Sequence, residues 1–207
     1  MPNLPRGVLF LTSGRPVLMP RRVLSKSDGD SVKLDLGCGR KPREGFEGVD
    51  RIAFPEVKHV VDLTAYPWPW ADGSVEEVHC SHYVEHLPAR DRVAFVNELH
   101  RILAPGGKVT LIAPHWASCR AYGDMTHQWP PVSEFWFYYL SKSWRSGNAP
   151  HDDAAHNPEG YSCDFDSTWG YSLHPSLGAR NQEYQSYAMQ WQKEAVQDVI
   201  ATLTKKG

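Results

Sequence analysis

Three short apolar runs, each with an aspartate at or near its end, constrain the fold more than any other feature of the sequence. The runs are "SVKLDLG" (31–37), "GFEGVD" (45–50) and "VKHVVDL" (57–63). Their length, their apolar content and the breakers around them predict buried strands. Gly37 and Gly39 follow the first run, and glycine allows the backbone to turn sharply and to come close to a ligand.

Two further strand candidates flank a helical pattern. "SVEEVHCS" (74–81) precedes it, and "GKVTLIAP" (107–114) follows it. Between them, apolar residues recur at spacings of three and four, which is typical of a helix, at Val93, Val96, Leu99 and Leu103. The "PGG" stretch at 105–107 ends this pattern. Strands that alternate with a helix predict an α/β fold with a mostly parallel sheet.

Three acids of these runs would meet at one edge of such a sheet. Asp35, Asp50 and Asp62 lie at or next to the ends of the first three strands. Ligands of open α/β folds bind at this edge, and an acid after the second strand can accept both hydroxyls of a ribose. The alternative is that the turns contain Gly and Asp for conformational reasons only. The convergence of three acids and a Gly turn favours a nucleotide-type site.

The motifs "DLGCG", "GVD", "VVDLTAYPWPWADGSVEEVHCSHYVEHL" and "ELHRILAPGGKVTLIAP" resemble the class I S-adenosylmethionine-dependent methyltransferases. More narrowly, they resemble the small methyltransferase-like proteins common in bacteria and phages. The resemblance covers about residues 32–114, and "AYGDMTHQWPPVSEFWFY" is also similar to a stretch that such proteins carry after the fifth strand. It implies one Rossmann-like domain, mostly parallel with a late antiparallel strand, and S-adenosylmethionine as cofactor.

The resemblance also implies a cofactor site. A loop under the methionine part and ribose would come from Asp35, Gly37, Cys38 and Gly39. Asp50, followed by Arg51, would hold the ribose hydroxyls, and Asp62 and Leu63 would border the adenine. The residues after the fourth strand that would face the methyl group are Cys80, Ser81 and His82.

One departure from the family pattern lies in the first crossover. Only "LGCGRKPREGFEGV" separates Asp35 from Asp50. Parallel neighbours usually need a connection of a dozen or more residues with a helix. We therefore expect the helix after the Gly loop to be missing or vestigial, together with any help from its dipole.

The acceptor side is predicted after the fifth strand. His115 follows this strand directly, and Tyr122, Asp124 and His127 come within the next twelve residues. Methyl transfer needs an aligned acceptor and, for nitrogen or oxygen acceptors, a base with a pKa near neutrality. His115 and His127 are the candidate bases, and Asp124 is a candidate orienting partner or substrate contact. Alternatively, either histidine forms structural hydrogen bonds in the loop.

Seven aromatic residues of this half could stack on a flat acceptor or roof a small pocket. They are Trp116, Tyr122, Trp129, Trp136, Phe137, Tyr138 and Tyr139, and we expect most of them in the core. The motifs typical of amino-methylating and C5-methylating nucleic-acid enzymes are absent from the sequence. The formal net charge of −2 also gives no sign of nonspecific duplex binding.

The stretch "CSHYVEHLP" (80–88) also fits H-x-x-E-H, a zinc-protease signature. Such a site needs the motif on a helix and a third ligand from elsewhere. Here the motif follows a predicted strand, and Pro88 interrupts any helix soon afterwards. A zinc protease is therefore not favoured, and we expect no metal. A noncatalytic metal site of Cys38, Cys80 and His82 is an alternative to cysteines that only pack around the pocket.

The organisation predicted for the 207 residues is an N-terminal arm (1–30) and one methyltransferase-like domain (31–207). The domain has a cofactor half (31–114) and an acceptor-side half (115–207). The acceptor-side half is expected to contain a helix over 132–144, a loop over 146–160, strands within 162–174 and a long amphipathic C-terminal helix over 181–203. Four scattered cysteines and the lack of a long apolar run favour a cytoplasmic protein without a membrane segment.

The favoured function is S-adenosylmethionine-dependent methyl transfer to a small-molecule acceptor of unknown identity. One alternative is the modification of a nucleotide or nucleic acid, for example in a phage pathway. Another is a non-catalytic module that binds S-adenosylmethionine. Neither the acceptor nor the oligomeric state can be derived from the motifs.

Overall fold

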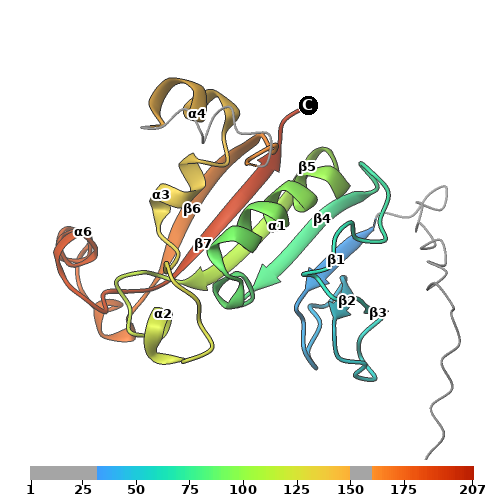
Figure 1. Cartoon of the computed structure of the whole chain (residues 1–207). Coiled ribbons are helices and arrows are strands. Elements are labelled where there is room, and N and C mark those ends of the chain that lie inside the picture. Colours follow the sequence, from blue (N-terminus) through green and yellow to red (C-terminus); the bar gives the residue numbers. More distant parts are fainter. Residues whose placement is uncertain (1–31, 150–159) are drawn as a thin grey trace, which may run out of the picture.

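The computed structural model describes residues 32–149 and 160–207. The predicted arm at 1–30 and most of the predicted loop at 146–160 lie outside this part of the chain. The described residues form one seven-stranded sheet with the order β3-β2-β1-β4-β5-β7-β6 (Figure 1). The strands are β1 (Lys33–Leu36), β2 (Glu47–Asp50), β3 (His59–Val60), β4 (Val75–Ser81), β5 (Leu103–Pro114), β6 (Phe165–Leu173) and β7 (Val196–Lys205).

Strands β1 to β5 are parallel wherever they pair, and β7 is antiparallel to both of its neighbours, β5 and β6. This arrangement confirms the predicted α/β fold, which is mostly parallel with a late antiparallel strand. Because β1 to β5 run in the same direction, their carboxyl ends share one edge of the sheet. No helix interrupts residues 37–46, so the predicted loss of the first crossover helix is also confirmed.

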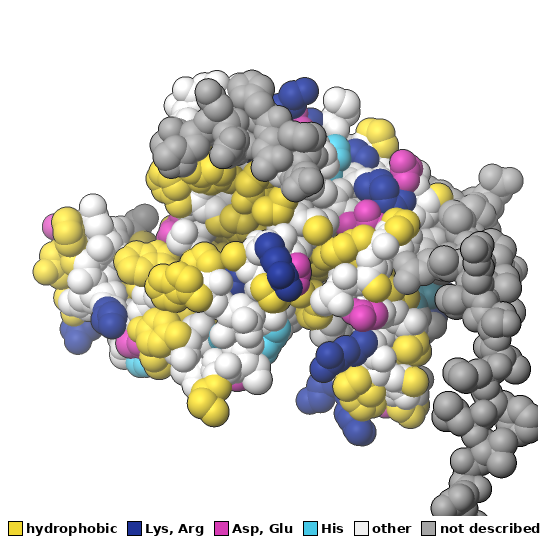
Figure 2. All heavy atoms as spheres, viewed as in Figure 1, with side chains coloured by type: hydrophobic (Ala, Val, Ile, Leu, Met, Phe, Trp, Pro, Cys, Tyr) yellow, Lys and Arg dark blue, Asp and Glu magenta, His cyan; other side chains and the backbone are white. Residues whose placement is uncertain are grey.

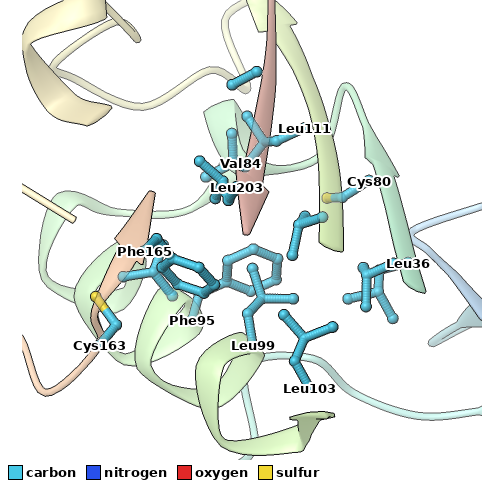
Figure 3. Close-up of a cluster of buried hydrophobic side chains, with 14 of the residues drawn as sticks. Leu36, Cys80, Val84, Phe95, Leu99, Leu103, Leu111, Cys163, Phe165 and Leu203 are labelled. Carbon is cyan, nitrogen blue, oxygen red and sulfur yellow. The ribbon is translucent and has the colours of Figure 1, made fainter. Parts of the chain in front are cut away.

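Helix α1 (Ala89–Ile102) packs its apolar stripe on the central strands (Figure 3). Phe95, Val96, Leu99 and Ile102 are fully buried there. Burial of a large apolar side chain contributes about 1.5–3 kcal/mol, so this stripe anchors the helix firmly. The predicted stripe is shifted at both ends, because Val93 is only half-buried and Leu103 already belongs to β5.

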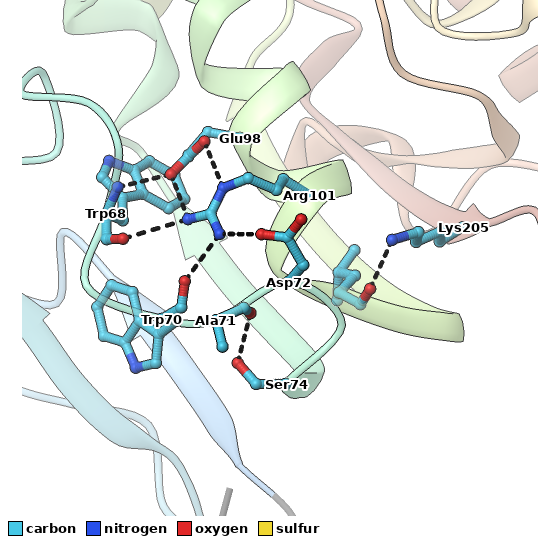
Figure 4. A network of polar contacts seen from close by, with 9 residues as sticks. Trp68, Trp70, Ala71, Asp72, Ser74, Glu98, Arg101 and Lys205 are labelled. Carbon is cyan, nitrogen blue, oxygen red and sulfur yellow. Dashed lines mark hydrogen bonds and ion pairs between the residues drawn. The ribbon is translucent and has the colours of Figure 1, made fainter. Parts of the chain in front are cut away.

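A polar network fixes the β3–β4 connection to the same helix (Figure 4). The buried Glu98 carboxylate accepts hydrogen bonds from the Trp68 backbone N–H at 2.6 Å and from the Arg101 guanidinium at 2.6 and 2.9 Å. Arg101 also donates to the Trp70 carbonyl and to Asp72. These bonds hold the loop after β3 in place, and that loop forms one wall of the cavity described below.

The prediction of a long C-terminal helix over 181–203 is wrong. Helix α6 (Gln182–Trp191) ends early, and the chain then forms β7. A turn separates them, with Glu194 in the left-handed region at φ 64°. The error has a physical cause, since apolar residues spaced by four, such as Ala195, Val199 and Leu203, fit both the helical period and the two-residue period of a strand.

The helix predicted over 132–144 is broken in two, α3 (Glu134–Tyr138) and α4 (Lys142–Asn148). Ser141 caps α4 by accepting a hydrogen bond from the Trp144 N–H. Buried Arg145 joins these helices to the start of β6 by donating to the carbonyls of Tyr139, Tyr161 and Cys163.

The expectation that most of the seven aromatic residues belong to the core is also wrong. Among them only Phe137 is fully buried, whereas Trp116, Tyr122, Trp129 and Tyr138 are at least 40% exposed. Hydrophobic side chains accordingly gather over α3 and around α2 (Arg120–Gly123) on the face shown in Figure 2.

The shorter elements are the 3-10 helices η1 (Val84–His86) and η2 (Pro175–Leu177). Over the described ranges, no helix combines the length and apolarity that a membrane crossing requires.

Candidate functional site

A cavity of about 570 Å³ opens at the carboxyl ends of β2 and β3, within the size range of small-molecule sites. Five of its lining residues were predicted from the sequence, namely Gly37, Asp50, Arg51, Asp62 and Leu63. The others are Ile52, Val61, Thr64, Tyr83, His86, Leu87 and Thr126. Three loops that follow β1, β2 and β3 therefore meet the segment after β4 around one hollow.

Asp50 organises the loops at the mouth of this cavity. One carboxylate oxygen accepts the Gly39 N–H at 2.9 Å, and the other accepts the Ile52 N–H at 2.9 Å. Each carboxylate oxygen has two lone pairs, so both oxygens keep an acceptor position free for a ligand. The side chain thus holds the Gly turn against the end of β2 and still presents charge to the cavity.

Gly37 allows a close approach between the first loop and Tyr83. Its φ of 70° lies in the left-handed region, and a Cβ atom there would come within 2.6 Å of the Tyr83 ring. The aromatic ring and the bare backbone together form a narrow part of the cavity wall. Burial raises the pKa of Tyr83, so this ring remains a neutral wall and hydrogen-bonding group.

Asp62 closes the cavity on the β3 side. Its carboxylate accepts hydrogen bonds from the Thr64 side chain at 2.7 Å and from the Thr64 N–H at 2.9 Å, and these bonds lower the pKa of Asp62. The acid is therefore ionised and fixed at the position that the resemblance assigns to the adenine border. Leu63 beside it is buried.

Several predicted cofactor residues do not line the cavity. Asp35 is 4% exposed, and its carboxylate binds the Arg43 N–H at 2.7 Å and His79 Nδ1 at 2.7 Å. This acid supports the first loop from below. Ser81 and Gly39 also lie outside the lining, and Gly39 contributes through its N–H to Asp50.

The two cysteines near the site are packing residues. Cys80 points into the core (Figure 3), so the expectation that it faces a methyl group is not supported by its position. Burial raises its pKa well above the usual value. Burial, with the charges of Asp35 and Asp50, raises the pKa of Cys38 to about 11. Both thiols are therefore protonated and poor metal ligands.

His115 is enclosed behind the end of β5, away from the cavity. It is 2% exposed, its Nδ1 accepts the Ala117 N–H at 3.3 Å, and its Nε2 lies 2.8 Å from a Glu134 oxygen. Because Nδ1 is the acceptor, Nε2 carries the proton and donates to Glu134. Both nitrogens are thus occupied, as in the structural alternative considered for this residue.

Glu134, which is partly exposed, completes this hydrogen-bonded group. Its carboxylate also accepts a hydrogen bond from the Tyr171 hydroxyl at 2.9 Å. Burial by itself would raise the pKa of Glu134, but the hydrogen bonds from His115 and Tyr171 lower it to about 2. Burial, together with the Glu134 charge, raises the pKa of Tyr171 to about 12.

The other predicted acceptor-side residues lie in the loop that follows. Asp124 is exposed and accepts the Thr126 N–H and hydroxyl, both at 2.8 Å, which lowers the pKa of Asp124. Tyr122 is 49% exposed and lies against Lys193. His127 is brought next to His86, with ring centroids 4.7 Å apart. The histidine that reaches the cavity is therefore His86, which the sequence pattern contained but we did not assign.

Arg92 explains why the loop and the segment after β4 lie together. This buried side chain donates to the Leu87 carbonyl at 2.9 Å, to the Gln128 carbonyl at 2.9 Å and to the Pro130 carbonyl. The Gln128 N–H also donates to the Glu85 carbonyl at 2.8 Å. The sequence signal for the role of Arg92 was its place as a charged residue on the buried face of the helix predicted around Val93–Leu103.

Comparison with known proteins supports the methyltransferase resemblance. Residues 45–111 match the family model described as a methyltransferase domain. This match covers about a third of the chain and supports the resemblance to methyltransferases that the motifs predict. No protein of curated function matches the sequence.

The chain resembles solved structures over most of its length. It is similar to a SAM-dependent methyltransferase from Archaeoglobus fulgidus, with a TM-score of 0.59 and 18% identity over 86% of this chain and 87% of that one. It is also similar to geranyl diphosphate C-methyltransferase from Streptomyces coelicolor A3(2), with a TM-score of 0.50 and 15% identity over 85% and 73% of the two chains. These likenesses show the fold, and together with the family match they confirm the predicted resemblance to methyltransferases.

Within this fold, the H-x-x-E-H stretch does not form the helix that a zinc protease requires. His82 ends the strand region in the left-handed conformation at φ 53°, and only the short η1 follows. His82 Nδ1 lies 3.2 Å from a Glu85 oxygen. Among the described residues, neither Cys38 nor Cys80 belongs to a group of three potential metal ligands, so the alternative cysteine site is not formed.

Proposed function

We propose that this protein transfers a methyl group from S-adenosylmethionine to a small-molecule acceptor. The cavity at the carboxyl edge of the sheet carries the proposal. It combines the Gly37 turn, the carboxylates of Asp50 and Asp62 and the Tyr83 ring in a chain that matches a methyltransferase model. S-adenosylmethionine, when bound, supplies a methyl group on a positively charged sulfonium.

The residues of the cavity fit this donor. Asp50 offers free acceptor positions to ribose hydroxyls, and Asp62 and Leu63 offer a polar and an apolar border for the adenine. Gly37 leaves backbone space in front of Tyr83 that a Cβ atom would fill. The chain's part in the reaction is to hold the donor, to align an acceptor and to exclude water.

The acceptor is proposed to enter on the side of His86 and Thr126. Both residues line the cavity, and His127 stands directly behind His86. This side contains the imidazoles that an acceptor approaching from solvent would meet, whereas His115 is enclosed. We accordingly transfer the acceptor-side role from His115 to His86, and we keep His127 as its neighbour.

A nucleotide acceptor is a second candidate, favoured by one observation. Trp116 and Trp129, which flank the loop that carries His127, are 51% and 80% exposed. Exposed aromatic rings stack on nucleobases. Replacement of both by Ala would weaken a nucleotide acceptor strongly and would leave a non-planar small acceptor nearly unaffected.

Calorimetry with S-adenosylhomocysteine tests donor binding. We expect one site per chain for the wild type and at least about tenfold weaker binding for Asp50→Ala, equal to a loss of about 1.4 kcal/mol. Asp166→Ala is the matched control, because this exposed acid lies on β6, far along the sheet from β2. No heat for the wild type, or equal affinity of both variants, would refute the proposal.

Turnover separates an enzyme from a non-catalytic binding module. The protein is incubated with a metabolite extract and a donor whose methyl group carries deuterium. Mass spectrometry then reports labelled products and S-adenosylhomocysteine. A chain that binds S-adenosylhomocysteine but forms no labelled product in extracts of several sources would favour the binding module.

A further inference from the structure

Glu85, His86 and His127 form a cluster beside the cavity that the methyl-donor function does not use. One potential ligand atom of each lies within 4.8 Å of those of the other two. Two segments supply them, η1 after β4 and the loop after α2. Arg92 and the Gln128 N–H tie these segments together, so the cluster is held by buried bonds and not by chance surface contact.

The hydrogen bonds of the two imidazoles place an N–H on Nδ1 of each ring. His127 Nδ1 lies 3.2 Å from the Ala121 carbonyl, which only accepts, so Nδ1 carries the proton. The Thr126 hydroxyl donates to Asp124, so toward His86 Nδ1, at 3.0 Å, it accepts. In the neutral form of each ring, the lone pair is then on Nε2. Metal-binding histidines typically donate their other ring N–H in this way.

Glu85 adds an independent observation. The residue is 3% exposed, and one of its oxygens interacts with His82 Nδ1. The other oxygen, Oε2, is buried and has no hydrogen-bond partner within the described structure. Arg92 passes close by, yet its guanidinium donates to main-chain carbonyls, including that of Glu85. A buried carboxylate oxygen without a partner is unfavourable, and a bound cation would satisfy it.

We propose that Glu85, His86 and His127 bind one divalent transition-metal ion of the zinc type. Two imidazole nitrogens and one carboxylate oxygen are the ligand set of many catalytic zinc sites, which keep a fourth position open. Mg²⁺ and Ca²⁺ prefer all-oxygen ligands and fit this set poorly. His86 is exposed, which gives an ion a path of entry, and it also lines the cavity.

The site explains what the H-x-x-E-H pattern becomes in this fold. Its glutamate and second histidine remain ligands, while His82 is used to hold Glu85. The third ligand, His127, comes from the loop after β5. An ion here would stand at the acceptor side of the cavity, where it could bind an oxygen-bearing acceptor; this last role rests on the proposed function, whereas metal binding does not.

Metal titration of the full-length chain tests the site. Chelator-treated protein is titrated with Co²⁺, whose visible absorption reports its coordination, and then with Zn²⁺ as competitor. We expect one ion per chain, confirmed by elemental analysis. His127→Gln should weaken Zn²⁺ binding by about 100-fold or more, because loss of outer-shell partners alone costs 10–100-fold. Zn²⁺ should raise the melting temperature of the wild type and not of this variant.

The control is His174→Gln, an exposed histidine that bonds within its own turn to Ser176. This variant should bind Zn²⁺ as the wild type does. Absence of stoichiometric binding, or equal affinities of His127→Gln and His174→Gln, would overturn the proposal. S-adenosylhomocysteine calorimetry of the same samples keeps the two proposals apart, since donor binding is expected to survive in His127→Gln.

Discussion

The segments that follow β4 and β5 start at the same sheet edge, and both begin with a histidine beside a carboxylate, yet they differ in how completely their polar atoms are paired. After β5, the buried His115 has both ring nitrogens occupied, and the partly exposed Glu134 accepts hydrogen bonds from His115 and from Tyr171. After β4, Glu85 keeps an unpaired buried oxygen, and His86 is exposed at the cavity. The first group, His115, Glu134 and Tyr171, is paired internally as a structural group is, and we call it the lock. The second group has free ligand atoms, as a binding site has.

The largest effect is expected from Arg92→Met, which removes the guanidinium that holds the β4 segment to the loop of His127. Several buried carbonyls lose a charged donor, so we expect a loss of about 3 kcal/mol in the free energy of unfolding. Urea unfolding measures it. Arg90→Met is the control, because Arg90 is exposed on the same helix and should change stability by less than about 0.5 kcal/mol. Equal losses in both variants would contradict the role of Arg92.

The next effect concerns the lock after β5 and depends on pH. The pKa of Glu134 is held at about 2 against an ordinary value of 4.5, because its hydrogen bonds outweigh its burial. The folded state therefore gains stability above pH 4.5 and loses it as the pH falls toward 2. We expect this linkage to contribute about 2 kcal/mol at neutral pH.

Glu134→Gln should remove this dependence. Unfolding measured at pH 7, 5 and 3 should show a weaker loss on acidification in Glu134→Gln than in the wild type. Glu44→Gln, at an exposed acid in the first crossover, serves as the control and should keep the wild-type slope. The same slope in all three proteins would show that Glu134 is not the stabilising acid.

A smaller effect is expected from Tyr171→Phe, which removes one hydrogen bond from the same lock. The loss should be about 1 kcal/mol, the typical contribution of one such bond. In the wild type, the pKa of Tyr171 is raised to about 12, first by burial and then by Glu134. Ultraviolet titration of the wild type should show one more tyrosine than the variant, and this tyrosine should ionise near pH 12. A difference between the two proteins near pH 10 would argue against the hydrogen-bonded pair of Tyr171 and Glu134.

The smallest effect on stability is expected at Cys119. This thiol is exposed, whereas Cys80 and Cys163 are buried and have raised pKa values. Iodoacetamide should modify Cys119 first in the folded protein, as peptide mass spectrometry can report. Cys119→Ser should change the free energy of unfolding by less than about 0.5 kcal/mol. Early modification of Cys80 would show that the core opens easily at β4.

The cofactor half was predictable because its signals are local. Each strand from β1 to β5 falls within a stretch that the local pattern predicts as a strand, and Asp50 and Asp62 lie at or just after the ends of β2 and β3. The acceptor half was not predictable to the same degree. Spacing by four left helix and strand undecided at 181–203, and no local pattern separates the enclosed His115 from the accessible His86.

The missed residues share one physical cause. Tyr83 lines the cavity because Gly37 has no side chain, and Arg92 matters because carbonyls distant in sequence converge on it. Both roles arise from contacts between segments that are far apart along the chain. A single sequence contains the residue types for such contacts but not the distances.

The short first crossover, between β1 and β2, is a position where the chain could be lengthened by insertion. Lys41 and Glu44 are exposed in the turn between β1 and β2, and parallel neighbouring strands are usually connected by a helix. Loop-closure entropy rises by only about 0.6 kcal/mol for each doubling of loop length. A helix or a small reporter domain could therefore be inserted here at low cost, provided that the Arg43 N–H keeps its bond to Asp35.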